Sequence, residues 1–111
     1  MIRNKEHEIW AKKVKQRDNY QCQICGKTNV YLNSHHLNSY DIYINDRTNL
    51  ANGIALCQEH HQMLHQIYGK GNNTAVQFEE FRQIMKIIQD LAKQNIKIAI
   101  EEKSKKEQDK K

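Results

Sequence analysis

Two short pairs of metal-ligand residues constrain the fold of this chain more than any other feature. Cys22-x-x-Cys25 and Cys57-x-x-His60 stand about thirty residues apart. Three thiolates and one imidazole are the number and kind of ligand that zinc takes in closed structural sites. The pattern therefore predicts a zinc knuckle made by Cys22, Cys25, Cys57 and His60. The alternative is a redox C-x-x-C with an unrelated Cys57, which the absence of a βαβ pattern around Cys22 disfavours.

A metal would also help a core as small as this one to stay folded. The chain has 111 residues, of which 38% are hydrophobic and 7% aromatic, and its mean hydropathy is −0.94. Such a length allows one small domain with an extension but not two ordinary domains. We expect a core at residues 1–71, followed at 72–111 by an amphipathic helix and charged tail that either belong to it or extend it.

Local patterns predict a mixed α+β fold. A first helix is expected at residues 5–16, with Ile9, Trp10 and Val14 on its apolar side and Trp10 as the core anchor. Gly26 suits the left-handed turn after Cys25. The remaining segments are a strand that ends at the pair His35-His36, an irregular loop at 38–51, a second strand around 54–56 that delivers Cys57, and a helix at 58–68 that Gly69 ends.

The last part of the chain is expected to begin with a capping box. Thr74 and Gln77 have the required spacing, and a stripe of apolar residues follows at intervals of three and four. The stripe predicts a long amphipathic helix at residues 75–95 and comprises Phe78, Phe81, Met85, Ile88 and Ala92. The pattern changes to alternation at Ile96, Ile98 and Ile100. This alternation fits either a short strand or a helix that is apolar on two sides.

Histidine forms a second cluster of candidate ligands. His61 and His65 would share one face of a helix, and one more imidazole would complete three nitrogen ligands with open positions for phosphate and water. His60 is assigned to the knuckle because it completes C-x-x-H, whereas the reverse assignment leaves the knuckle with three ligands and gives the helix pair the poorer spacing i, i+5. A histidine pair at a strand end is by itself more often a surface or core feature. His7 is expected to be an exposed helix residue.

Positive charge is concentrated outside the histidine-rich centre. Residues 1–20 carry six Lys and Arg against three acids, and residues 70–100 carry five against three, but residues 21–69 carry two against three. Basic flanks suit a polyanion, although many solvated helices look the same. No apolar run is long enough to cross a bilayer and the N-terminus has no signal-peptide core, so we expect a cytoplasmic protein without a membrane partner.

Residues 10–71 resemble an HNH endonuclease of the ββα-metal (His-Me finger) type with a zinc staple, as found in phages and mobile elements. The motifs that carry the resemblance are R-D-N-Y-Q-C-Q-I-C-G at 17–26, S-H-H-L at 34–37, N-G-I-A-L-C at 52–57 and H-Q-M-L-H at 61–65. The order His-His, Asn, His-x3-His is also similar to that of DNA-cutting colicins. The resemblance covers more than half of the chain and includes several independent motifs.

The resemblance implies a role for each matching residue. His35 would bind the catalytic divalent metal together with His61 and His65, and His36 would be the general base for the attacking water. Asn52 would hold the loop and the His36 ring. Two departures stand out, because relatives often have cysteine in place of His60 and an acid in place of His35. The all-histidine ligand set leaves Mg²⁺, Mn²⁺, Ni²⁺ and Zn²⁺ open as the catalytic ion.

The implied activity is hydrolysis of phosphodiester bonds in double-stranded DNA, by nicking or by double-strand cleavage. Phosphate contacts would come from exposed cations, and the candidates are Lys12, Lys13, Lys15, Arg17 and Arg47. For Arg47 the alternative is a loop arginine that contacts only solvent. The likeness alone implies a phage origin, action in the host cytoplasm, and a terminase or other phage protein as partner. The alternative function is a non-catalytic zinc-ribbon module that binds DNA or acts as an adaptor.

Overall fold

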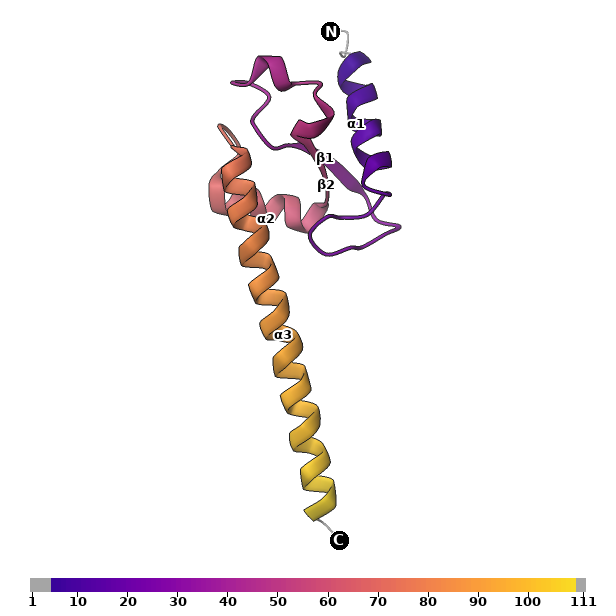
Figure 1. The fold of residues 1–111 in the computed structure, drawn as a ribbon, viewed down its shortest axis with the longest axis vertical. Helices are drawn as coiled ribbons and strands as arrows, with labels where there is room; N and C mark the ends of the chain where they lie inside the picture. The colour runs from indigo at the N-terminus through magenta and orange to yellow at the C-terminus, as the bar shows by residue number, and fades with distance from the viewer. Residues whose placement is uncertain (1–4, 110–111) are drawn as a thin grey trace. The chain divides into compact units, whose positions relative to one another are not determined.

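The computed structural model describes residues 5–109 and has a small α+β fold. Two antiparallel strands and three helices make up the regular structure, with two short 3₁₀ helices between the strands (Figure 1). In chain order the elements are α1 (Lys5–Arg17), β1 (Leu32–His36), 3₁₀ helices Ile44–Asp46 and Leu50–Asn52, β2 (Gly53–Cys57), α2 (Gln58–Tyr68) and α3 (Ala75–Asp109). The expected strands and first two helices are thus present within a residue or two of their predicted positions.

The chain divides into two compact units, Met1–Phe81 and Arg82–Lys111. The division lies within α3, whose first two turns carry the buried side chains Phe78 and Phe81. All candidate site residues belong to the first unit, and the described residues of the second unit, 82–109, are helical. In the part of the chain that the structure describes, no helix combines the length and the apolar character that a membrane crossing requires.

The β1–β2 hairpin lies between α1 and α2, and each strand contacts both helices (Figure 1). Side chains alternate between the two faces of the hairpin because successive residues of a strand point to opposite sides. On one face, Ser34 Oγ donates a hydrogen bond to the carbonyl of Ala11 in α1 at 2.7 Å. On the other face, Asn33 Nδ2 donates to Gln58 Oε1 in α2 at 3.0 Å.

The face toward α1 contains a small apolar core. Trp10, Val14 and Ala55 are buried together, which confirms Trp10 as an anchor. Gly53 lies so close to α1 that an added Cβ would be 2.6 Å from Trp10 Cζ2. The prediction that Ile9 belongs to the apolar stripe is wrong, because its side chain is 46% exposed.

The end of α1 is tied to β2 by charged side chains. Arg17 donates hydrogen bonds to the carbonyls of Leu50 at 2.7 Å and Gly53 at 2.6 Å. Asp18 accepts one from the amide of Ala55 at 2.8 Å. Asn19 and Tyr20 then adopt positive φ angles of 57° and 53°, which end the helix and turn the chain toward the knuckle. These polar contacts fix the end of α1 against the hairpin, in addition to the apolar contacts of Trp10 and Val14.

The segment 38–51 is mostly irregular, as expected, and is anchored at the start of α3. Asn38 Oδ1 accepts a hydrogen bond from the amide of Ala75 at 2.8 Å, and the amide of Ser39 donates to the carbonyl of Asn73 at 2.9 Å. The predicted capping box is confirmed. The Thr74 amide donates to Gln77 Oε1, and the Gln77 amide donates to Thr74 Oγ1, each at 3.2 Å.

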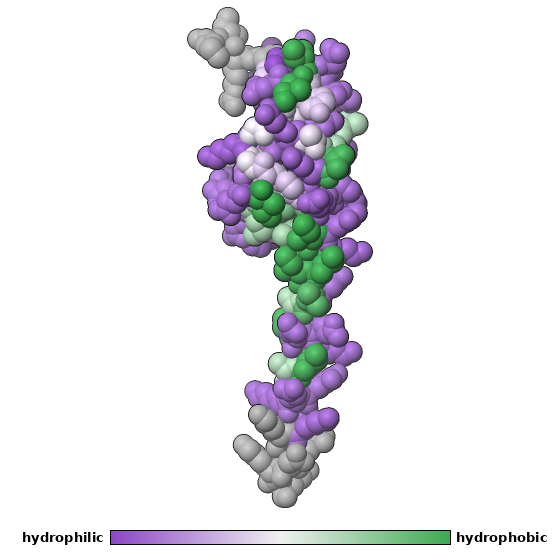
Figure 2. All heavy atoms as spheres, turned by 90° about the vertical axis from the view of Figure 1, so that its left-hand side faces the viewer, coloured by the Kyte–Doolittle hydropathy of each residue, from purple (hydrophilic) through white to green (hydrophobic). Residues whose placement is uncertain are grey.

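The helix α3 extends beyond the predicted end at residue 95. Residues 96, 98 and 100 lie within it, so the alternating isoleucines belong to a helix that is apolar on two sides, rather than to a strand. Ile88, which belongs to the predicted apolar stripe, is 52% exposed. Figure 2 shows apolar side chains at the surface of α3. From residue 84 onward, the exposed large apolar residues are Ile84, Ile87, Ile88, Leu91, Ile96, Ile98 and Ile100.

Candidate functional site

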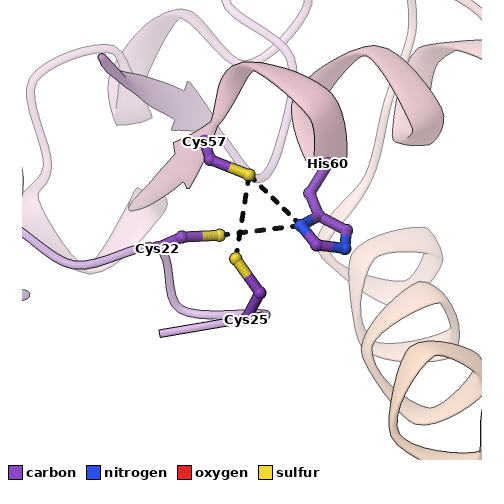
Figure 3. A group of neighbouring side chains, drawn as sticks. All are labelled: Cys22, Cys25, Cys57 and His60. Atoms are coloured by element: carbon purple, nitrogen blue, oxygen red, sulfur yellow. Dashed lines mark hydrogen bonds between the residues drawn. The ribbon is translucent and has the colours of Figure 1, made fainter. Parts of the chain in front are cut away.

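Cys22, Cys25, Cys57 and His60 form one cluster, called here the Cys₃His cluster. Cys22 and Cys25 lie in the turn between α1 and β1, Cys57 ends β2, and His60 lies in the first turn of α2 (Figure 3). One ligand atom from each residue lies within 4.8 Å of all the others. The structure therefore brings together two ligand pairs that the sequence separates by about thirty residues.

Distances within the Cys₃His cluster match a tetrahedral metal site better than a disulfide. Cys25 Sγ and Cys57 Sγ lie 3.9 Å apart, and Cys57 Sγ lies 3.2 Å from His60 Nδ1. Two thiolates bound tetrahedrally to one zinc ion are separated by about 3.8 Å, whereas a disulfide bond is about 2.05 Å long. All three cysteines are free. The cluster could hold a metal such as zinc.

The backbone of the turn prepares Cys22 to act as a thiolate ligand. Gly26 has a φ of 75°, and its amide donates to the carbonyl of Cys22 at 2.8 Å. Burial opposes ionisation of the Cys22 thiol, but backbone N–H groups of Cys57, Cys25 and Ile24 hydrogen bond to the sulfur and lower its pKa. Burial raises the pKa of Cys25 to about 11, so a cation would be needed to hold both sulfurs as thiolates.

His35, His61 and His65 form a second group, the three-histidine cluster. Their ligand atoms also lie within 4.8 Å of one another, and Nε2 of His61 lies 3.0 Å from Nε2 of His65. Two nitrogen atoms bound to one ion at about 2.1 Å each can be at most about 4.2 Å apart, which this pair satisfies. His65 Nδ1 donates to the carbonyl of Gly69 at 2.9 Å, which leaves Nε2 as its ligand atom.

The charge state of the three-histidine cluster also suits a metal. Burial, with smaller contributions from His61, His65 and His36, lowers the pKa of His35 to about 3. Burial and the neighbouring His65 lower the pKa of His61. His35 Nε2 is buried and has no hydrogen-bond partner among the described residues. A neutral ring with an unpaired buried nitrogen is the form of histidine that binds a cation.

His36 has a different environment on the opposite face of the hairpin. Its Nε2 lies 2.9 Å from the carbonyl oxygen of Arg47. A carbonyl only accepts hydrogen bonds, so Nε2 carries the hydrogen and Nδ1 is the proton acceptor of the neutral ring. Burial lowers the pKa of His36, the carbonyl of Arg47 opposes this shift, and the nearby His7 and the Arg47 side chain add to it.

Asn52 is buried and connects two parts of the loop. Its Oδ1 accepts a hydrogen bond from the Asn38 amide at 2.8 Å, and its Nδ2 donates to the carbonyls of Asn38 at 3.0 Å and Asp46 at 3.2 Å. Asp46 precedes Arg47, whose carbonyl holds His36. Asn52 therefore fixes the stretch of backbone that orients the His36 ring.

An open cleft of about 250 Å³ joins these groups. Its lining includes His35, His36, His61 and His65, together with Ser39, Tyr40, Asp41 and Lys70. The sequence did not identify Ser39 or Lys70 as site residues, because neither belongs to a motif. A larger hollow of about 420 Å³, lined by Ile9, Trp10, Lys13 and Leu50 among others, contains none of the clustered histidines. We place the candidate site in the smaller cleft because the clustered histidines line it.

The basic residues expected to contact DNA fall into two groups. Lys12 and Lys13 are exposed on α1, and the Lys15 ammonium lies 5.9 Å from the centre of the Tyr31 ring. The guanidinium of Arg17 donates hydrogen bonds to the carbonyls of Leu50 and Gly53. Arg47 Nε donates to the carbonyl of Tyr40 at 2.7 Å, and its guanidinium lies 4.0 Å over the Tyr40 ring. Both arginines therefore have structural roles.

His7 is not the exposed residue that the sequence suggested. It is half-buried, and its ring centre lies 5.5 Å from those of Trp10 and His36 and 5.7 Å from that of Tyr40. The spacing of three between His7 and Trp10 was the available signal, because residues three apart share a face of a helix.

No protein family model matches the chain, and the curated proteins and the solved structures contain no match either. Function is therefore inferred from the residues of the site and their geometry.

Proposed function

We propose that this chain is a metal-dependent HNH endonuclease that hydrolyses phosphodiester bonds in DNA. The observation that carries the proposal is the convergence of four imidazoles on one cleft. Three of them form a cluster of candidate nitrogen ligands, and the fourth keeps an acceptor nitrogen. Three nitrogen ligands leave coordination positions open, which is typical of catalytic rather than structural metal sites.

In this proposal β1, the loop, β2 and α2 form a ββα-metal core. His35 reaches the site from β1, and His61 and His65 reach it from consecutive turns of α2. A divalent cation, when bound there, supplies positive charge to the phosphate and to the leaving oxygen. Mg²⁺, Mn²⁺, Ni²⁺ and Zn²⁺ are all candidates, and the nitrogen ligands favour the softer ions.

His36 acts as the general base. Its Nδ1 takes a proton from the water that attacks the phosphorus, while Nε2 stays hydrogen-bonded to the Arg47 carbonyl. The lowered pKa of His36 keeps the ring neutral, and so able to accept a proton, near pH 7. Asn52 keeps the carbonyl in place through Asp46.

The proposed substrate is double-stranded DNA, held through its phosphates. Lys12 and Lys13 provide exposed positive charge on α1, and Lys70 lines the cleft itself. Contacts of this kind read no sequence and weaken as salt rises. We therefore expect cleavage with loose sequence preference.

A plasmid assay tests the proposal. Supercoiled plasmid is incubated with the wild type, His36→Ala and Gln62→Ala in Mg²⁺, Mn²⁺ or Ni²⁺, and nicked and linear products are measured. Gln62 is an exposed residue between the two α2 ligands and serves as the matched control. Wild type and Gln62→Ala should cleave, and His36→Ala should lose about a hundredfold or more in rate. Equal amounts of intact circle with all three proteins in every metal would reject the nuclease.

The Cys₃His cluster supports a second candidate, a zinc-ribbon module that binds DNA without cutting it. The same plasmid separates the two. Retarded migration of intact circle in every metal, with no nicked product, would favour the binding module. Cleavage that depends on His36 would exclude it.

A further inference from the structure

We propose that Trp10 is a positioning residue for His36, which makes α1 a third element of the site alongside the hairpin and α2. The inference rests on the proposed function. The indole of Trp10 lies face to face with the His36 imidazole, with ring centres 3.9 Å apart and planes 13° from parallel. Trp10 is 2% exposed. The sequence gives Trp10 only a packing role, and the stack adds a contact with the proposed base.

The stack supplies a restraint that the hydrogen bond of His36 lacks. The hydrogen bond to the Arg47 carbonyl fixes the position of His36 Nε2. The imidazole can still rotate about the axis that joins Nε2 to the carbonyl oxygen. Contact with a flat indole fixes the plane of the ring. A proton acceptor must be both near and aligned to take a proton from water, so both restraints are needed to aim Nδ1.

The indole is itself held by the loop that holds His36. Trp10 Nε1 donates a hydrogen bond to the carbonyl of Asn49 at 2.8 Å, two residues after the carbonyl that His36 uses. The two rings are therefore hydrogen-bonded to the same backbone segment, residues 47–49. A shift of that segment would move both rings in the same direction and preserve the stack.

The register of the hairpin explains why the indole can reach His36. Gly53 is the residue of β2 that pairs with His36 of β1. A Cβ at Gly53 would overlap Val14 Cγ2 and lie 2.6 Å from Trp10 Cζ2. Because position 53 has no side chain, the face of the hairpin is open there and the indole occupies the space beside the imidazole.

Steady-state cleavage by Trp10→Leu, Trp10→Phe and Val14→Ala tests the inference. Leucine fills part of the core without an aromatic face, and phenylalanine restores the face without the N–H. Val14 lies in the same core one turn further along α1 and serves as the control for lost packing. Rates are normalised to the folded fraction, which is measured by circular dichroism, and metal content is measured alongside.

We expect Trp10→Leu to lower kcat by about ten- to a hundredfold with KM changed by less than about twofold. Trp10→Phe should recover most of the rate, and Val14→Ala should keep the wild-type kcat. If Trp10→Leu and Val14→Ala have the same kcat per folded molecule, Trp10 has a packing role only and the inference is wrong. A change confined to KM would also overturn it.

The fluorescence of Trp10, the only tryptophan in the chain, tests the stack without any cleavage. The His36 ring covers one face of the indole, so its removal in His36→Ala changes the surroundings of the indole and should change the emission of Trp10, whereas Gln62→Ala should not. Unchanged emission in His36→Ala would overturn the stack and the inference with it. A change in emission together with a wild type that cuts no plasmid would instead reject the proposed function and, with it, the catalytic part of the inference.

Discussion

His35 and His36 are consecutive in the chain and both line one cleft, but their rings contact different helices. The His35 ring lies 5.2 Å from that of His61 and 5.6 Å from that of His65, on the side of α2. The His36 ring stacks on Trp10 on the side of α1. Strand alternation thus lets a single dipeptide supply the proposed metal ligand and the proposed base without competition between them.

We expect this separation to appear in metal binding. His35→Ala should weaken binding of the second metal ion at least about tenfold, because one of three ligands is lost. His36→Ala should bind that ion as the wild type does and lack only cleavage. Isothermal titration of zinc-loaded protein with Mn²⁺ or Ni²⁺ measures both. Equal loss of binding in the two variants would mean that His36 is also a ligand.

Removal of one cysteine should unfold the first unit. Cys25→Ala leaves three ligands for the structural ion in a small core, and structural zinc contributes on the order of 10 kcal/mol to folding in small domains. We expect loss of bound zinc and of a cooperative thermal transition. The control is Gln23→Ala, an exposed residue in the same turn. An unchanged melting temperature in Cys25→Ala would contradict a structural metal.

Gly53→Ala should destabilise the protein although it adds only a methyl group. The new Cβ would overlap Val14 Cγ2 and Trp10 Cζ2 within a buried core, so α1 must move away from the hairpin. Overpacking of this kind costs about 1–3 kcal/mol. Chemical denaturation measures the loss, with the exposed Gly71→Ala as the control because a Cβ there meets no atom within 4 Å.

The sequence was sufficient to predict the strands, the first two helices and the composition of the Cys₃His cluster, whereas His35 was assigned to the three-histidine cluster only through the family resemblance. The helix at 58–68 has the predicted bounds, because Cys57 and Gly69 limit it on either side. Knuckle spacing and helical periodicity are local signals, and they identified Cys22, Cys25, Cys57 and His60 as one group. His61 and His65 were paired for the same reason, since residues four apart share a helix face.

The contacts that the sequence could not predict are those between α1 and the rest of the fold. The stack of Trp10 on His36, the ring contacts of His7 and the carbonyl contacts of Arg17 all join α1 to residues far along the chain. No periodic pattern encodes such contacts. Arg17 in particular is exposed, but its guanidinium also contacts the carbonyls of Leu50 and Gly53 and the Asp18 carboxylate, and the contacts with the two distant carbonyls were not visible in the sequence.

The stability of the protein should fall in mild acid because His35 is buried in its neutral form. Its pKa is about 3 in the folded protein against 6.5 in the unfolded chain. Between these values the unfolded chain binds a proton that the folded protein does not, so the free energy of unfolding decreases as pH falls below 6.5. From pH 7 to pH 4 the loss attributable to His35 is at most about 3 kcal/mol.

His35→Leu isolates this contribution. Protonation of the cysteines affects the wild type and the variant alike, so the difference between their pH dependences reports His35. Urea denaturation at a series of pH values should give a steeper decline for the wild type than for His35→Leu. Parallel declines would show that His35 is protonated in the folded state.

Asn52 should affect catalysis more than its contribution to folding suggests. Asn52→Ala leaves the Asn38 amide without its acceptor and removes two donated hydrogen bonds, one of them to Asp46. An unsatisfied buried group of this kind costs about 1–3 kcal/mol. The larger consequence concerns His36, because the segment 46–47 loses its support and the Arg47 carbonyl no longer holds Nε2 in one position.

Comparison with two further variants separates these effects. Asn52→Asp keeps the acceptor for the Asn38 amide but places a carboxylate oxygen opposite the carbonyls of Asn38 and Asp46, so it should lose activity as Asn52→Ala does. Asn49→Ala removes an exposed side chain whose Oδ1 accepts from the Ala51 amide at 3.1 Å, and it should change stability slightly and cleavage little. Cleavage per folded molecule and metal binding are measured for all three. If Asn52→Ala cleaves as fast as Asn49→Ala per folded molecule, the loop does not orient His36, and the base is held by the Trp10 stack alone.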